Sequence, residues 1–139
     1  MIARTASIAN SPQQGFSLIE LIVAIAIVGI LTSFAVPSYR DSMRRGYIEE
    51  ATALLASGRI AVEQYYLDNR TYVGVPCPVG TTHFTIFCTT TATTYSLKAE
   101  GNGTVAGFAY TLNEHDVRTT VGGWGDGNCW ILRHGDSCP

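Results

Sequence analysis

The hydrophobic pattern of this 139-residue chain changes twice along its length. From Phe16 to Pro37 nearly every residue is apolar. From there to about Leu67, apolar residues recur every three to four positions, which is the spacing of one face of an α-helix. Beyond Leu67, short stretches of alternating residues are separated by clusters of Gly, Asn and Asp, a pattern that predicts an antiparallel sheet.

The first apolar run is long enough to cross a bilayer. Its 22 residues would extend about 33 Å as a helix, and a hydrocarbon core is about 30 Å thick. One interpretation is the signal anchor of a single-pass membrane protein. Residues 1–15 are not an ordinary secretory signal, because the apolar segment follows Gly15 instead of preceding a cleavage site.

One continuous helix is expected from Phe16 to about Leu67. Pro37 has no amide N–H and leaves the Ser33 carbonyl without its helical partner, so a kink is expected there. Gly29 lowers helix stability by about 1 kcal/mol relative to Ala. The second half is amphipathic, with an apolar stripe of Tyr47, Ile48, Ala51, Leu54, Leu55, Gly58, Ala61, Val62, Tyr65 and Tyr66 opposite the charged residues Arg44, Arg45, Glu49, Glu50, Arg59 and Glu63.

The remaining residues, 68–139, predict a small sheet that covers this stripe. Asp68 to Thr93 is expected to be a loop region with at most short local structure. Strands are expected at Thr94–Glu100, Ala106–Leu112, Val117–Val121 and Cys129–Arg133. Turns at Gly101–Thr104 and Asn113–Asp116 separate the first three of them. The predicted fold class is α+β, a long N-terminal helix packed on a four-stranded antiparallel sheet.

The four cysteines, Cys77, Cys88, Cys129 and Cys138, all lie in the C-terminal half. An even number in a small chain with a membrane-directing N-terminus indicates disulfides in an oxidising compartment. Three pairings are possible, and spacing favours Cys77–Cys88 and Cys129–Cys138, each stabilising the fold by about 2–3 kcal/mol. Zinc is the competing interpretation, because a histidine falls between each cysteine pair, but the spacings lack the short knuckle of structural zinc sites.

The junction Gly15-Phe16-Ser17-Leu18-Ile19-Glu20, followed by the apolar run, resembles the class III signal of type IV prepilins. The resemblance implies that a prepilin peptidase removes residues 1–15 by cutting between Gly15 and Phe16. The same enzyme would methylate the new amine of Phe16. The family usually has Lys or Arg immediately before the glycine, whereas this chain has Gln13 and Gln14.

Glu20 raises a question that this processing would answer. An ionised carboxylate in hydrocarbon costs several kcal/mol unless it is partnered, and a favourable helix dipole offsets only about 0.3–1 kcal/mol. Cleavage would create a cationic amine on Phe16, four residues away and on the same helical face. This amine could be matched by Glu20 of its own chain or by Glu20 of a neighbouring chain. The resemblance implies that this amine pairs with Glu20 of a neighbouring subunit and sets the register of assembly.

The resemblance also implies the organisation and partners of the chain. Residues 16–67 would be the pilin helix, with 16–37 as its transmembrane and assembly part, and residues 68–139 would be the head. The segment between Gly29 and Pro37 would be able to unwind in the filament, and the short disulfide-closed C-terminal loop resembles minor pilins. The partners would be other pilin subunits, the peptidase and the inner-membrane assembly machinery. The chain would start in a bacterial inner membrane, with a periplasmic head, and finish in an extracellular pilus.

The rest of the sequence points away from catalysis. It contains no nucleophile elbow and no phosphate-binding glycine loop, and no cofactor or metal is expected. The histidines are expected in loops or turns: His83, His115 and His134.

Three functions stay open at this point: a structural subunit for twitching motility or adhesion, a tip subunit that binds DNA or a host surface, and a type II secretion pseudopilin. The charge of the chain argues against DNA binding. The net charge is −2, and the residues beyond Leu67 include four basic and six acidic ones. The aromatic residues of the Gly-rich turn, Trp124 and Trp130, are expected to pack, or else to form a contact patch at a filament tip.

Overall fold

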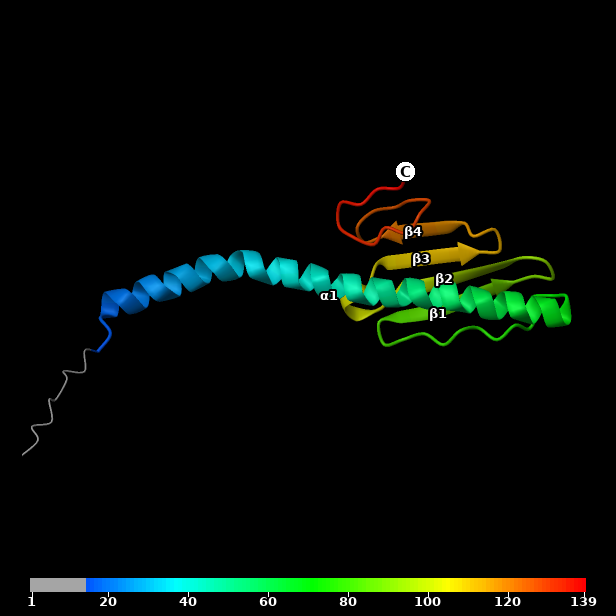
Figure 1. Ribbon diagram of the computed structural model, residues 1–139, viewed down its shortest axis with the longest axis horizontal. Coiled ribbons are helices and arrows are strands. Elements are labelled where there is room, and N and C mark those ends of the chain that lie inside the picture. The colour runs from blue at the N-terminus through cyan, green and yellow to red at the C-terminus, as the bar shows by residue number, and fades with distance from the viewer. Residues whose placement is uncertain (1–14) are drawn as a thin grey trace, which may run out of the picture. The chain divides into compact units, whose positions relative to one another are not determined.

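The computed structural model describes residues 15–139 (Figure 1). The chain divides into two compact units, and the first of them ends at Pro37. The helix α1, Leu18–Asn69, is the only regular element of the first unit among these residues and continues into the second. The second unit, Ser38–Pro139, adds β1 (Phe84–Thr90), β2 (Tyr95–Gly101), a short 3₁₀ turn η1 (Gly103–Val105), β3 (Phe108–Asn113) and β4 (Arg118–Gly122). The expected leader lies outside the described residues except for Gly15.

The end of α1 follows from its last residues. Arg70 takes a left-handed conformation, with φ of 60°, and its amide donates to the carbonyl of Tyr66 at 2.7 Å. The side chain of Asn69 donates to the carbonyl of Tyr65 at 3.0 Å. These bonds satisfy carbonyls that a helix terminus otherwise leaves unpaired.

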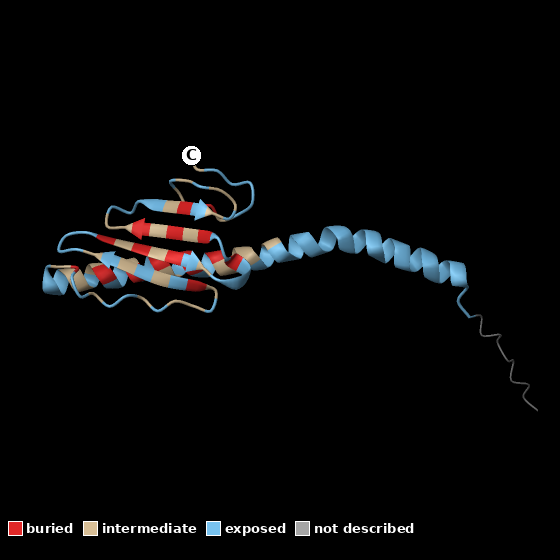
Figure 2. Cartoon of the chain, turned by 180° about the vertical axis from the view of Figure 1, so that it is seen from behind, coloured by how far each residue is buried: buried red, intermediate tan, exposed pale blue. Residues whose placement is uncertain are grey.

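The four strands form an antiparallel meander in the order β1-β2-β3-β4. Burial alternates along β1, β2 and β3 (Figure 2), and the buried residues of the sheet belong to one core with those of α1. The predicted fold class is therefore confirmed. The buried core joins Ile48, Ala51, Leu55 and Val62 of α1 to Phe84, Tyr95, Leu97, Ala99, Phe108, Tyr110 and Leu112 of the sheet.

One strand lies where the sequence pattern predicts a loop. Asp68–Thr93 is not all loop, because β1 occupies Phe84–Thr90 and pairs with β2. Phe84 faces the core, but Phe87 points to the other face and is 50% exposed. This exposed aromatic interrupts the alternation from which a half-buried strand is predicted.

The strand predicted at Cys129–Arg133 is also wrong. One side chain satisfies the backbone of this segment: the hydroxyl of Thr120 donates to the carbonyl of Cys129 at 2.7 Å and accepts from the amide of Ile131 at 2.9 Å. Outside its pairing with β3, β4 makes only an isolated bridge between Thr120 and Gly127 among residues 15–139. Apolar composition alone therefore does not make this segment a strand.

Each disulfide closes a loop beside one edge strand of the sheet. Cys77 is joined to Cys88 of β1, and Cys129 is joined to Cys138 after β4. All four sulfurs are oxidised, so none is a thiolate that could bind zinc. The loops lie next to β1 and β4, whose outer edges would otherwise expose unpaired backbone groups.

The apolar stripe of α1 is narrower than predicted. Ala61 is exposed, whereas Glu63, predicted on the charged face, is half-buried. Gly58 is buried against the head. A side chain does not fit there, because an added Cβ would lie only 2.7 Å from Pro78 Cγ and would also contact Leu97. Glycine has a low helix propensity, but at this position it allows α1 to pack closely against Pro78 and Leu97.

Candidate assembly helix and head surface

The start of α1 contains half of a capping box. The hydroxyl of Ser17 accepts a hydrogen bond from the amide of Glu20 at 3.4 Å, and the Ser17 carbonyl accepts from Leu21 at 3.2 Å. The sequence Ser-x-x-Glu at residues 17–20 is the signature of this cap, and it is independent of the hydrophobic pattern from which the helix is predicted. Glu20 therefore lies in the first helical turn, where the helix dipole favours a negative charge.

Glu20 has no cationic neighbour in its own segment. Residues 15–37 contain no Lys, Arg or His. Phe16 is 87% exposed and precedes the helix, which begins at Leu18. The structure thus places Phe16 and Glu20 at the same end of the segment without joining them.

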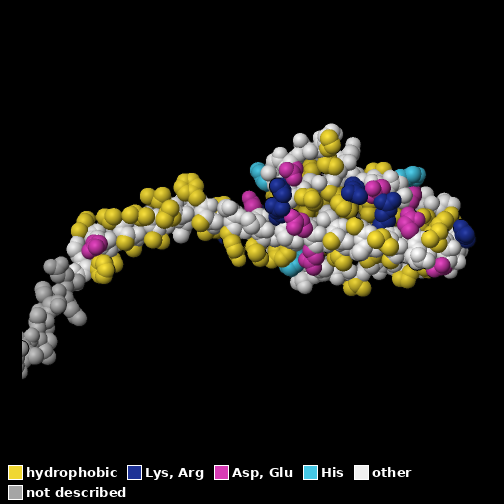
Figure 3. All heavy atoms as spheres, in the orientation of Figure 1, with side chains coloured by type: hydrophobic (Ala, Val, Ile, Leu, Met, Phe, Trp, Pro, Cys, Tyr) yellow, Lys and Arg dark blue, Asp and Glu magenta, His cyan; other side chains and the backbone are white. Residues whose placement is uncertain are grey.

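The first unit exposes an apolar surface on all sides of its helix. An 18-residue stretch of α1 has a mean hydropathy of 2.5, and none of it is buried. In Figure 3 hydrophobic side chains cover this half of the helix. By length and composition the helix is able to cross a membrane. The exposed large residues here include Leu18, Ile19, Leu21, Ile25, Val28, Ile30, Leu31 and Phe34.

Gly29 and Pro37 do not interrupt the helical secondary structure. Between them, Thr32 donates its hydroxyl to the carbonyls of Val28 and Gly29, each at 3.0 Å, and Ser33 donates to Ile30 at 2.7 Å. Hydroxyls that bond to preceding carbonyls in this way offer the backbone an alternative to the helical ladder. Unwinding of this segment during assembly stays a prediction.

In the second unit, Glu63 is held by two tyrosines. Tyr95 and Tyr72 donate their hydroxyls to its two carboxylate oxygens at 3.0 and 3.1 Å. Burial, helped by the bond to Glu63, raises the pKa of Tyr72 to about 12 and moves the pKa of Tyr95 well above its usual value. Because both phenols keep their protons, the cluster is a structural link between α1 and the sheet.

A second cluster combines cations with an aromatic ring. Asp116 accepts from Arg59 of α1 at 2.6 Å and from Arg118 of β4 at 3.1 and 3.2 Å. The guanidinium carbon of Arg118 lies 4.7 Å from the ring centroid of Trp130, and the indole N–H donates to the carbonyl of Thr111 at 2.9 Å. Arg59 precedes Leu67 and is therefore absent from the four basic residues of the predicted head. The fold brings it from α1 to this cluster.

The other predicted loop residues have structural surroundings. Trp124 packs edge-on against Phe108 at a centroid distance of 5.3 Å. His83 stacks on Tyr47 of α1 at 3.6 Å, and His115 lies in the turn after β3. Within residues 15–139, no three His, Cys, Asp or Glu side chains gather as a metal site.

Comparison with known proteins identifies the family. Residues 10–36 match the model of the prokaryotic N-terminal methylation motif. Residues 37–112 match the model described as type IV minor pilin ComP, DNA uptake sequence receptor. The chain belongs to the type IV minor pilin family. This family is one of structural pilins and is not an enzyme family.

The individual relatives include a type IV major pilin and a fimbrial protein. The major pilin PilE1 of Neisseria gonorrhoeae is 44% identical over 75 residues, covering 50% of this chain and 46% of that protein. The fimbrial protein EcpC of Eikenella corrodens is 46% identical over 56 residues, covering 40% of this chain and 37% of that protein. The match to these curated relatives thus spans less than half of their length.

A solved structure shares the fold. The non-core minor pilin PilV of Neisseria meningitidis superposes with a TM-score of 0.53, covering 60% of this chain and 91% of that chain. The sequence identity is 20%, so this likeness concerns the fold alone.

Proposed function

We propose that this pilin is made as a membrane-anchored precursor that a prepilin peptidase cuts between Gly15 and Phe16. Residues 1–15 form the leader, 16–67 the helix and 68–139 the head. Phe16 is then N-methylated, and the inner-membrane assembly machinery draws the subunit into the pilus. The observation that carries this proposal is Glu20, a carboxylate in an exposed apolar segment that has no cation of its own.

The new amine of Phe16 supplies the missing charge. A methylated amine is still a secondary amine, so it carries a proton and a positive charge. In apolar surroundings an unmatched charge costs several kcal/mol, and the amine of one subunit therefore docks where Glu20 of a neighbour lies. This requirement fixes how far one helix slides along the next.

Replacing Glu20 by glutamine tests this mechanism, because the side chain keeps its size and loses its charge. We expect Glu20→Gln to be processed and inserted normally, while its amount in sheared pili falls about tenfold or more. Ser17→Ala is the matched control, since it removes the cap but keeps the carboxylate. Wild-type incorporation of Glu20→Gln would refute the pairing.

The location of the subunit follows from the same proposal. The apolar helix anchors it in the inner membrane, and the two disulfides support an oxidising, periplasmic environment for the head. Deleting the gene separates a pilus subunit from a type II secretion pseudopilin, when twitching, adhesion, transformation and exoprotein release are all scored. If the protein is a pseudopilin, only exoprotein release should be lost.

A second candidate function is binding of duplex DNA by the head. Two observations favour it: the matching family model is described as a DNA uptake sequence receptor, and Arg118 lies over Trp130 with Arg59 held nearby through Asp116. Arginine guanidinium groups suit the phosphate oxygens of a duplex backbone. Because the chain has a net negative charge, DNA could contact only the small surface around these two arginines.

A gel shift over a series of salt concentrations tests this second function on the purified full chain. We expect Arg118→Gln to weaken binding and to lower the salt slope by about 1. Lys98→Gln is the control, because Lys98 lies between core-facing residues on the opposite face of β2. Binding that is independent of salt, or equal losses in both variants, would reject this surface.

A further inference from the structure

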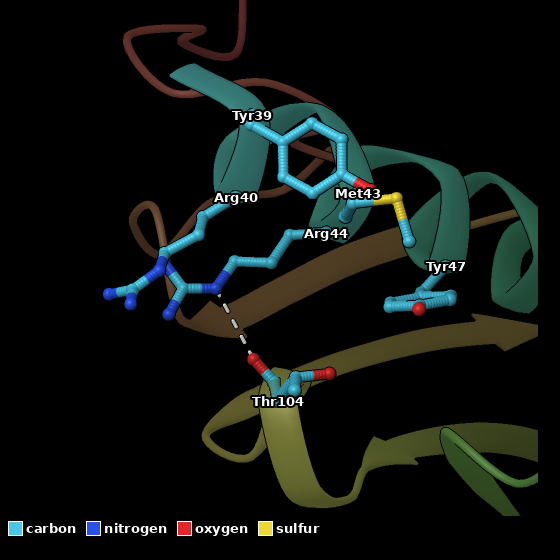
Figure 4. A pocket seen from close by; sticks show the side chains of 6 residues that line it. All are labelled: Tyr39, Arg40, Met43, Arg44, Tyr47 and Thr104. Carbon is cyan, nitrogen blue, oxygen red and sulfur yellow. Dashed lines mark hydrogen bonds between the residues drawn. The ribbon is translucent and has the colours of Figure 1, made fainter. Parts of the chain in front are cut away.

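A groove of about 470 Å³ lies near the start of the second unit. One wall presents Tyr39 and Met43, which are 67% and 42% exposed. At the other end, Arg40 and Arg44 extend side by side (Figure 4). The lining consists of Tyr39, Arg40, Met43, Arg44 and Tyr47 of α1 and Thr104 of η1.

The cationic end of the groove is partly fixed. Arg44 Nε donates to the carbonyl of Thr104 at 3.3 Å, and its Nη1 lies 3.6 Å from Asp41. Arg40 is in no ion pair within residues 15–139. The groove therefore combines one oriented guanidinium with one whose donors face solvent, next to an apolar wall.

The charge around the groove differs from that of the rest of its unit. The lining of the groove contains two arginines and no acidic residue, while Arg45, which is not part of the lining, is paired with Glu49. Residues 49–139 contain five basic and nine acidic residues. The local excess of positive charge fits an anionic ligand.

The groove also lies close to the apolar run along the chain. Arg40 follows Val36, the last residue of that run before Pro37, by four residues, which reach at most about 14 Å even when fully extended. Side chains on a helix tilt toward its N-terminus, so both arginines tilt toward the N-terminal end of the second unit. The headgroup layer on each side of a bilayer is about 5–8 Å thick. The Arg40 guanidinium can therefore reach the headgroups of a membrane that the run crosses, and the Arg44 side chain extends beside it (Figure 4).

The position of these arginines runs against the usual bias of membrane proteins. Lys and Arg are in excess on the cytoplasmic flank of a membrane span. The disulfides of this head indicate the other, oxidising side. Arg45 is paired with Glu49 at 2.8 Å and Arg44 lies 3.6 Å from Asp41. Arg40, which has no ion pair within residues 15–139, therefore calls for an anionic partner at the membrane surface.

We propose that this groove binds an anionic phospholipid, with Arg40 and Arg44 on the phosphate and with Tyr39 and Met43 against the glycerol and the upper acyl chain. The proposal rests on the membrane anchoring proposed above. Guanidinium groups are well suited to phosphate oxygens, and tyrosines are enriched at the membrane interface. Bound lipid would hold this end of the helix at the membrane surface until the subunit enters the pilus.

Lipid binding is measured on the full chain in a non-ionic detergent. Phosphatidylglycerol and phosphatidylcholine with identical acyl chains are added separately, and retained lipid is counted by native mass spectrometry. We expect wild type to prefer phosphatidylglycerol by about tenfold and the Arg40→Gln/Arg44→Gln variant to lose the preference. The control, Arg70→Gln/Arg133→Gln, removes the same charge from exposed positions and keeps it.

Each other outcome has a definite meaning. No preference in wild type, or an equal loss in the control, overturns the proposal. A double variant that keeps the preference but disappears from sheared pili also overturns it, and assigns the groove to a neighbouring subunit. If the double variant fails to fold, Arg40→Gln alone replaces it, with an expected loss of about threefold.

Membrane insertion is scored separately by resistance to alkaline carbonate extraction. A wild-type chain that is extracted defeats the proposed anchoring itself. A wild-type chain that stays inserted but shows no headgroup preference defeats only the lipid groove.

Discussion

The hydroxyl of Tyr95 in β2 lies 3.0 Å from Oε1 of Glu63 in α1 and donates a hydrogen bond to it. Tyr95 is only 2% exposed, so this bond is shielded from water and joins the helix to the sheet. A charged acceptor makes the bond stronger than one between neutral groups. The pair therefore helps to fix how the head packs on its helix.

Removing the Tyr95 hydroxyl should destabilise the head. We expect Tyr95→Phe to lower the free energy of unfolding by about 1.5–3 kcal/mol, since it deletes a hydrogen bond to a charged group. Urea denaturation at pH 7 measures the change. Tyr65→Phe is the control, because its hydroxyl bonds at 3.3 Å near the surface, and its loss should be below about 1 kcal/mol.

Alkaline pH should weaken the same cluster. The pKa of Tyr72 is raised to about 12 in the folded chain, chiefly by burial, whereas an unfolded tyrosine titrates near 10. Below pH 10 both states hold the proton and the contribution to stability is complete. As pH rises from 10 to 12 the unfolded state loses protons first, so the free energy of unfolding falls.

The matched variant for this pH dependence is Tyr72→Phe. Its stability should fall less steeply than that of wild type between pH 10 and 12, when both are followed by denaturant titration at fixed pH. Identical slopes in the two proteins would show that Tyr72 is not held in its protonated form by the fold.

Gly58→Ala and Gly46→Ala should change stability in opposite directions. Both glycines lie within α1, and alanine favours the helix by about 1 kcal/mol at an open site. Gly46 has nothing within 4 Å of an added Cβ, so stability should rise. At Gly58 the Cβ meets Pro78 and Leu97, and overpacking should cost about 1–3 kcal/mol. Thermal unfolding of the two variants provides the comparison, and a stabilised Gly58→Ala would mean that the 71–81 loop gives way.

The two disulfides should contribute nearly equal stability. Their cysteines are 11 and 9 residues apart, and each closed loop is worth about 2.5–3 kcal/mol in the chain-entropy description. Paired Cys→Ser variants at Cys77/Cys88 and at Cys129/Cys138 measure both by denaturant unfolding. A much larger loss for one pair would show that its loop also protects an edge strand through native contacts.

Much of this fold follows from local sequence signals. The long helix is predictable because a nearly continuous apolar run of 22 residues leads into a segment with helical period. Strands β2 to β4 are predictable because turns rich in Gly, Asn and Asp separate alternating runs. In contrast, the pattern did not predict β1, because the exposed Phe87 breaks the alternation of apolar and polar residues. It did predict a strand at Cys129–Arg133, which is apolar but does not form one. Both errors arise because strand pairing depends on neighbours far away in the chain.

The head surface was less predictable than the helix. The helical pattern predicts that Glu63 faces solvent. In the structure, Tyr72 and Tyr95 donate hydrogen bonds to it, because the fold brings them next to the helix. Likewise, Arg59 and Arg118 are 59 positions apart in the sequence and share Asp116 only after folding. The Ser17–Glu20 cap, by contrast, was visible as Ser-x-x-Glu.

The central claim is that processing gives the mature subunit a charged Phe16 amine to match the carboxylate of Glu20. Mass spectrometry of the chain recovered from sheared pili tests it most directly. The account predicts a polypeptide that begins with N-methylphenylalanine at position 16 and has all four cysteines oxidised. Chains that retain residues 1–15 within intact filaments would contradict it.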